Sequence, residues 1–186
     1  MRFQQHWTGC LLDDIVVVAD DGSKKRRLAI QVKHDLTFSD ALTNTEFAEV
    51  INACWKTFNS ALWNFNRDSD RLGIALGIPQ PKIDKHFKPI LEWARTSGNS
   101  EEFLQKISLP KFSSREKQDY LKIIRNLLGR AKGSDLVNDE LWQFLKCLVI
   151  LDFDLETAGS RDTTDSWNRL ITIIKGQDGN QAKLPF

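Results

Sequence analysis

The sequence predicts an α/β fold, with a small mixed sheet flanked by helices and a helical C-terminal extension. Two apolar runs, residues 13–18 and 28–33, are separated by the turn-forming stretch Asp20-Asp21-Gly22-Ser23 and should pair as a β-hairpin. Between residues 44 and 62, apolar residues recur at three- and four-residue steps, which is typical of a helix. A long helix after a strand pair can cover one sheet face, and this combination predicts α/β layering.

The hairpin determines which side chains share a face. Because side chains alternate along a strand, Gln31 and Lys33 point to the same face. Antiparallel folding brings the acidic start of the first strand beside them, and Asp14 shares their face if it lies opposite Gln31. An acid, an amide and an ammonium group then meet at one sheet edge, where a divalent cation and a phosphate can bind. The alternate positions should point into a core: Leu28, Ile30 and Val32.

The long helix and the strand after it have clear boundaries. Thr43 or Asn44 can cap the helix, and Glu46 lies in its first turn, where the helix dipole favours negative charge. Residues 70–77 predict a short buried strand that ends at Gly77. The expected buried stripe of the helix consists of Phe47, Val50, Ile51, Cys54, Trp55, Phe58 and Leu62.

The two ends of the chain also carry signals. Residues 2–11 predict a short helix, and most of the chain after residue 80 has helical periodicity. Residues 113–116 resemble a capping box, residues 148–154 an apolar strand that ends in acids, and residues 165–174 a last helix. Residues 176–181 have the composition of a linker.

Composition excludes several classes of protein. A hydrophobic fraction of 41% and a charged fraction of 27% are those of a globular chain, and 186 residues suffice for a buried core. With a net charge of +1, any basic contact surface has to be local. We find no secretory signal and no apolar run long enough to span a bilayer. Three widely spaced cysteines predict a reducing, cytoplasmic location rather than a disulfide framework.

Asp14, a strand, Gln31-Val32-Lys33 and a long helix follow one another in that order. This pattern resembles the core of the PD-(D/E)xK nuclease superfamily, in which an acid or glutamine lies two residues before a lysine. More narrowly, the chain looks like the double-stranded-DNA endonuclease effector domain of bacterial antiphage defence proteins. The resemblance is carried by Phe3-Gln4, Asp13-Asp14-Ile15, Gln31-Val32-Lys33-His34, Phe47, Trp55, Asp70-Arg71-Leu72 and Phe153-Asp154.

The resemblance implies a domain organisation and partners. Residues 1–175 would form a nuclease domain with a restriction-endonuclease-like core, made of residues 1–78, a helical region and the late strand 148–154. Residues 176–186 would link it to a sensor, either a cyclic-oligonucleotide receptor or a STAND ATPase. The implied partner is double-stranded DNA, with homo-oligomerisation on activation and no role for a membrane.

The resemblance also implies a site for Mg²⁺ or Mn²⁺, with Asp14, Gln31 and Lys33 as candidate catalytic residues. Asp14 would be the main carboxylate ligand, Gln31 would supply an amide oxygen, and the backbone carbonyl of Val32 another ligand. Magnesium often needs only one or two carboxylates, because it keeps several waters. The metal would activate water, and Lys33 would stabilise charge on the phosphoryl group.

The chain departs from the family pattern at its start. Only the five residues from Thr8 to Leu12 separate Arg2–Trp7, the start of the expected first helix, from Asp13, which leaves little room for a first strand. Many members carry an extra acid there, whereas residues 1–12 contain none. Asp13, Glu46 and Glu49 are the possible substitutes.

DNA contacts can come from two places. Lys24, Lys25, Arg26 and Arg27 form the one dense basic run, at the end of the hairpin remote from Gln31. His34 follows the motif directly and can reach the phosphate backbone.

Two alternatives remain open. In the first, the same fold is catalytically inactive and serves as a DNA- or protein-binding module. In the second, the chain is a mainly helical interaction domain to which the hairpin is incidental, and it has no DNA affinity at low salt.

Overall fold

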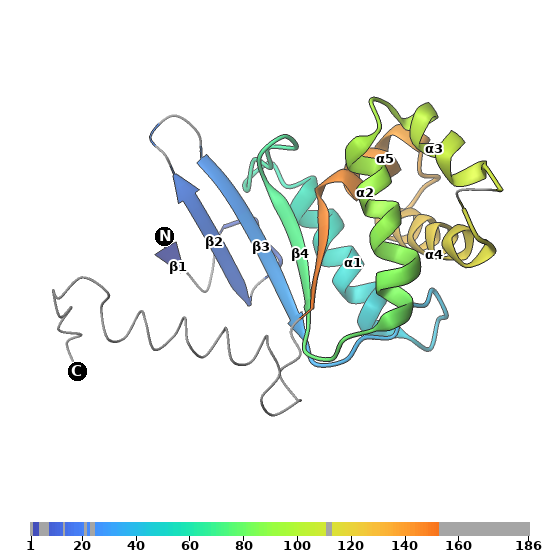
Figure 1. Cartoon of the computed structure of the whole chain (residues 1–186). Coiled ribbons are helices and arrows are strands. Elements are labelled where there is room, and N and C mark those ends of the chain that lie inside the picture. Colours follow the sequence, from blue (N-terminus) through green and yellow to red (C-terminus); the bar gives the residue numbers. More distant parts are fainter. Residues whose placement is uncertain are drawn as a thin grey trace, which may run out of the picture.

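The computed structural model describes residues 8–12, 14–20, 22, 25–110 and 113–152, together with the backbone of residues 2–3. Its centre is one sheet with the strand order β1-β2-β3-β4-β5 (Figure 1). The strands are β1 (Arg2–Phe3), β2 (Ile15–Asp20), β3 (Lys25–Lys33), β4 (Arg71–Leu76) and β5 (Leu148–Asp152).

The sheet is mixed. The four longer strands contain one antiparallel pair, β2–β3, while β3–β4 and β4–β5 are parallel. The short strand β1 adds a further antiparallel pairing against β2. The predicted hairpin is therefore confirmed, and the α/β class with it.

Helices account for most of the other described residues. They are α1 (Thr45–Phe58), the π-helix η1 (Ile83–Phe87), α2 (Lys88–Thr96), α3 (Ser100–Ser108), α4 (Arg115–Lys132) and α5 (Asn138–Cys147). The Asn44 side chain caps α1 by accepting a hydrogen bond from the backbone N–H of Phe47 (3.4 Å), as predicted. None of the described helices is long and apolar enough to cross a membrane.

The five α-helices lie on one side of the sheet (Figure 1), and the core forms between them and that sheet face. Val16, Ala29, Leu72 and Ile74 supply the sheet side of the core, and the stripe of α1 from Phe47 to Phe58 lies against it. The stripe is confirmed except for Leu62, which is 76% exposed because α1 ends at Phe58.

The expectation about the hairpin faces was partly wrong. The core lies on the face of Ala29, Gln31 and Lys33, whereas Val32 on the other face is 43% exposed. Alternation predicted correctly that Gln31 and Lys33 share a face, but not which face the helices cover. The candidate site residues therefore lie on the helix side of the sheet.

Two local predictions were also wrong. Residues 2–3 form strand β1 against β2, so no helix begins at Arg2, and a first strand exists where the spacing left little room for one. Ser114 precedes α4, but its side chain makes no capping hydrogen bond. The predicted elements over 153–154, 165–174 and 176–181 lie outside the described residues.

Candidate functional site

The start of β2 is held against the end of β3 by one carboxylate. Oδ2 of Asp14 accepts hydrogen bonds from Nε2 of Gln31 and from the backbone N–H of Val32, each at 2.5 Å. The strand register ends at Ile15 opposite Ile30, so one further step places Asp14 opposite Gln31. The structure thus confirms the juxtaposition of Asp14 and Gln31.

The ammonium group of Lys33 is held by α1. Its Nζ lies 3.0 Å from Oε1 of Glu46, in the first turn of that helix. The N-terminus of α1 is in turn fixed to the chain after β3, because Nδ2 of Asn44 donates to the carbonyl of Thr37 at 2.6 Å. Glu46, one of the possible substitute acids, therefore lies beside the lysine of the motif.

The backbone of Val32 also faces this site. In a strand, the N–H and C=O of one residue point to the same side, and the N–H of Val32 points to Asp14. The neighbouring carbonyl of Lys33 points the opposite way and accepts from Gly77 N at 2.9 Å. The Val32 carbonyl is consequently directed toward the β2 side, beyond the point where β2 begins.

These groups form what we call the edge cluster: Asp14, Gln31, Val32, Lys33 and Glu46. It offers two carboxylates, an amide and a peptide carbonyl, which are hard oxygen donors of the kind that Mg²⁺ and Mn²⁺ prefer. The described part of the chain contains no group of three or more His, Cys, Asp or Glu side chains that could hold a metal ion. A cation here would therefore need the amide oxygen, the peptide carbonyl and water as ligands in addition to the two carboxylates.

Two hollows flank the N-terminal half of α1. The first, of about 520 Å³, is lined by Asp35, Thr37, Ser39, Ala41, Thr43, Asn44 and Glu46. The second, of about 550 Å³, lies between α1 and α4 and includes Glu49, Lys56 and Arg130. Glu46, a member of the edge cluster, therefore lines the first hollow, whereas Glu49 lines the second. Asp13 lies outside the described residues.

The basic run does not act as one surface. Arg27 has a structural role, because its Nε and a terminal nitrogen pair with the buried Asp70. The other contacts of its guanidinium are the carbonyls of Trp63 and Asn64, each at 2.7 Å, and the ring of Trp63, whose centroid lies 4.2 Å away. We therefore remove Arg27 from the expected DNA contacts.

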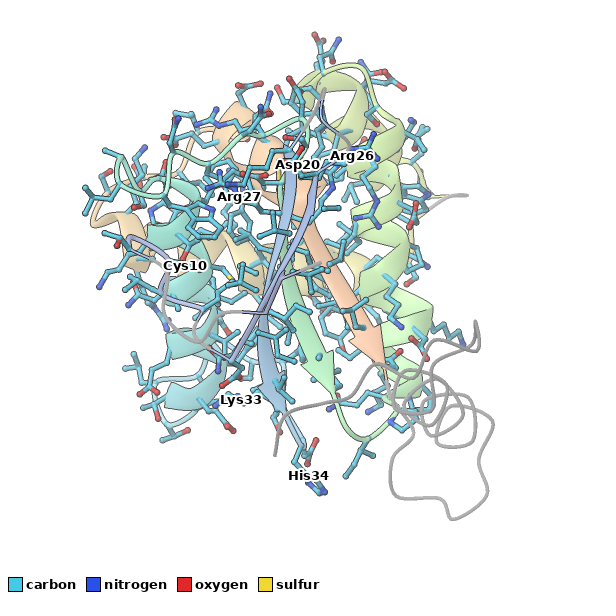
Figure 2. The ribbon with its side chains drawn as sticks, turned by 90° about the vertical axis from the view of Figure 1, so that its left-hand side faces the viewer. Cys10, Asp20, Arg26, Arg27, Lys33 and His34 are labelled. Atoms are coloured by element: carbon cyan, nitrogen blue, oxygen red, sulfur yellow. The ribbon has the colours of Figure 1, made fainter. Side chains whose placement is uncertain are left out.

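The other basic residues lie at two ends of the hairpin. Figure 2 shows Asp20 and Arg26 at one end of the strands, and Lys33 and His34 at the other. Lys25 to Lys33 spans about 26 Å at the usual rise of a strand. Lys25, Arg26 and His34 are exposed. Only His34 is therefore near the edge cluster, and Lys24 lies outside the described residues.

Sequence reasoning missed a second group of charges at the carboxyl ends of the parallel strands. Lys88 Nζ contacts Oδ2 of Asp152 at the end of β5, and Oδ1 of Asp84 in η1 at 2.7 Å. Asp152 is paired in the sheet with Leu76, which is paired with Lys33. The available signal was Asp152, an acid at the end of the apolar run 148–151.

The two carboxyls in this group differ in proton affinity. Burial raises the pKa of Asp152, against the effect of its hydrogen bond with Lys88. Burial also acts on Asp84, but hydrogen bonds with Lys88 and Asp152 outweigh it and lower the pKa. Burial disfavours the charged form of Lys88, yet hydrogen bonds with Asp152 and Asp84 raise its pKa. On acidification, Asp152 thus takes up a proton before Asp84.

No family model, curated protein or solved structure matches the chain. The fold and the site therefore define an α/β protein with a mixed sheet and a carboxylate-amide-lysine cluster at one sheet edge, and the assignment of a function rests on that cluster.

Proposed function

We propose that this chain is a metal-dependent DNA endonuclease of the PD-(D/E)xK type, and that it is the effector domain of an antiphage defence protein. The observation that carries the proposal is the edge cluster, in which Asp14, directly before β2, is held against Gln31 and Val32 on β3, beside Lys33 and Glu46. The order of antiparallel meander, helix and parallel strand supports the same assignment.

The residues of the cluster suit a hard divalent cation. Oδ2 of Asp14 is occupied by two donors, which fixes the carboxylate and directs its other oxygen away from β3. The Val32 carbonyl points to the same side, and Glu46 adds a second carboxylate from α1. A bound Mg²⁺ or Mn²⁺ would activate a water and neutralise charge on the phosphoryl oxygens.

Gln31 and Lys33 have separate tasks in this proposal. The amide nitrogen of Gln31 orients Asp14, which leaves its carbonyl oxygen as the end that can face the cation or its water shell. The ammonium of Lys33, held by Glu46, supplies positive charge where a phosphoryl group gains negative charge during hydrolysis.

The remaining expectations belong to the same proposal. Double-stranded DNA is the substrate class, and the domain works in the cytoplasm as part of a longer chain with a sensor or ATPase. Oligomerisation on activation would bring two sites onto opposite strands.

A plasmid-nicking assay with Mg²⁺ tests the activity. We expect Asp14→Asn and Lys33→Ala to reduce the nicking rate by at least 10²-fold, the order typical for loss of a group that stabilises transition-state charge. Glu46→Gln should reduce it as well. Glu49→Gln is the matched control, because it removes the same charge from the same helix but in the second hollow.

The same variants also show whether the activity has been assigned to the wrong residues. If all four proteins nick DNA at the wild-type rate, the activity belongs to a contaminant or another site. If Glu49→Gln is impaired and Glu46→Gln is not, the wrong carboxylate has been assigned.

An inactive binding module is the second candidate. It is favoured by the small number of carboxylates in the edge cluster, since the described residues contain no group of three such ligands. It predicts DNA binding at low salt that is unchanged by Mg²⁺ and by Asp14→Asn, with no strand cleavage at any metal concentration.

A further inference from the structure

The centre of the sheet face opposite the helices carries only aliphatic residues and glycine. We call it the open face. Register and alternation place these residues on it: Ile15, Val17, Leu28, Ile30, Val32, Gly73, Ala75, Val149 and Leu151. The core formed with the described helices lies on the other face, at Val16, Ala29, Leu72 and Ile74, and Figure 1 shows the five described α-helices gathered beyond β5.

An aliphatic sheet face of this kind is normally packed against another part of the protein or against a partner. Sheets with parallel strands are normally covered on both faces, because their connections place helices there, and β3, β4 and β5 are parallel. Ile15 and Val32 are 37% and 43% exposed, and Val17, Leu28, Val149 and Leu151 are half-buried around Ile30, Gly73 and Ala75, which are buried. A contiguous aliphatic patch of this kind marks a docking surface.

We propose that the open face is the docking site of this chain's own segment 165–174. The described chain leaves the sheet at Asp152, at the end of β5, and residues 153–186 follow directly. The segment is thus tethered beside the face, which gives it a high effective concentration compared with a separate partner.

The sequence of the segment suits this surface. Trp167, Leu170, Ile171 and Ile174 recur at steps of three, one and three, which forms one apolar stripe on a helix. Thr172 falls on the opposite side of the same helix, and Asn168 and Ile173 lie at its two flanks. Asp165 precedes the stripe, and Gly176 follows it, as helix start and stop signals.

The dimensions agree as well. A helix over residues 165–174 is about 15 Å long, and strands of five or six residues span about 17–20 Å. Residues 153–164 can reach about 40 Å when extended, which is more than the return to the open face requires.

The first test uses the full chain with Leu170→Asp and the matched control Thr172→Asp, which adds the same charge on the other side of the helix. We expect Leu170→Asp to lower the urea midpoint, to increase binding of the dye ANS and to accelerate hydrogen exchange in β2 and β3. The control should behave like the wild type. Indistinguishable behaviour of the two variants would overturn the proposal.

A milder test remains valid if Leu170→Asp fails to fold. In a double-mutant cycle, Val17→Ala on the open face and Leu170→Ala in the segment should each lower the urea midpoint, and the double variant should lose less than their sum. Additive losses would contradict the contact. Losses that shrink as protein concentration rises, together with a dimer in light scattering, would show that a second copy covers the face instead.

Discussion

At the scale of single residues, Asp70 and Arg27 show how much one buried ion pair organises. Asp70 has a 2% exposed side chain, and it also accepts hydrogen bonds from the backbone N–H groups of Arg27 (3.1 Å) and Asn66 (3.0 Å). Arg27 adds bonds to the carbonyls of Trp63 and Asn64. The pair thereby attaches the loop between α1 and β4 to the first third of β3, the strand whose other end carries the edge cluster.

Asp70→Asn should therefore destabilise the protein strongly. The substitution keeps the size of the side chain but leaves the guanidinium of Arg27 without its counter-charge in a largely buried place, which typically costs about 3–5 kcal/mol. Urea unfolding at neutral pH measures the loss. Asp68→Asn, an exposed neighbour two residues away, is the control and should change stability by less than about 0.5 kcal/mol. Equal effects of the two substitutions would contradict the structural role of the pair.

At the scale of elements, the group of Asp84, Lys88 and Asp152 joins the helical region to the end of β5. Lys88 begins α2, Asp84 lies in η1, and Asp152 is the last residue of the strand. One ammonium thus bridges a helix turn and a strand end. These residues border the carboxyl ends of the parallel strands, where β3 also ends with Lys33.

The pH dependence of this group follows from the directions of its pKa shifts. The pKa of Asp84 is lowered, so its contribution to stability is present above the pKa of the unfolded chain and is lost as pH falls through the folded pKa. The pKa of Lys88 is raised, so its contribution is complete below the unfolded pKa and is lost as pH rises through the folded value. Asp152 has a raised pKa and works in the opposite sense to Asp84.

Lys88→Met should accordingly be most destabilising near neutral pH. There it leaves two adjacent carboxylates without a cation, whereas in acid their protonation removes the repulsion, so the difference from the wild type should shrink as pH falls. Urea midpoints measured at several pH values test this. Lys85→Met, in the π-helix that carries Asp84, is the control, and a loss that grows toward acid would refute the assignment.

At the scale of the whole molecule, the fold places the edge cluster where two layers meet. The sheet supplies Asp14, Gln31 and Val32, and the helical layer supplies Glu46 from the start of α1. The core on that side includes Phe47, one residue after Glu46, which is fully buried. The position of the second carboxylate thus depends on how α1 packs against the sheet.

If the cluster binds a cation, the whole protein should be stabilised by it. Mg²⁺ or Mn²⁺ at a hundred times its dissociation constant adds about 2.7 kcal/mol by mass action. Thermal unfolding with and without the metal measures the effect, which Asp14→Asn should abolish and Glu49→Gln should leave in place. Stabilisation that survives Asp14→Asn would place the cation elsewhere.

Local signals determined much of this fold. The hairpin, the stripe of α1 with its Asn44 cap and the buried strand β4 each depend on alternation, periodicity or a short-range cap, and such patterns are visible in the sequence. The meeting of Asp14 with Gln31 followed from the hairpin alone, because antiparallel register couples residues that are close in sequence.

Only the tertiary structure decided the rest. Four features depend on contacts between separate elements. They are the face of β3 that the helices cover, the ion pair of Arg27 with Asp70, the position of Glu46 rather than Glu49 beside Lys33, and the bridge from Lys88 to Asp152. Those contacts depend on how layers pack, and packing is a property of the whole chain that no local pattern of residues records.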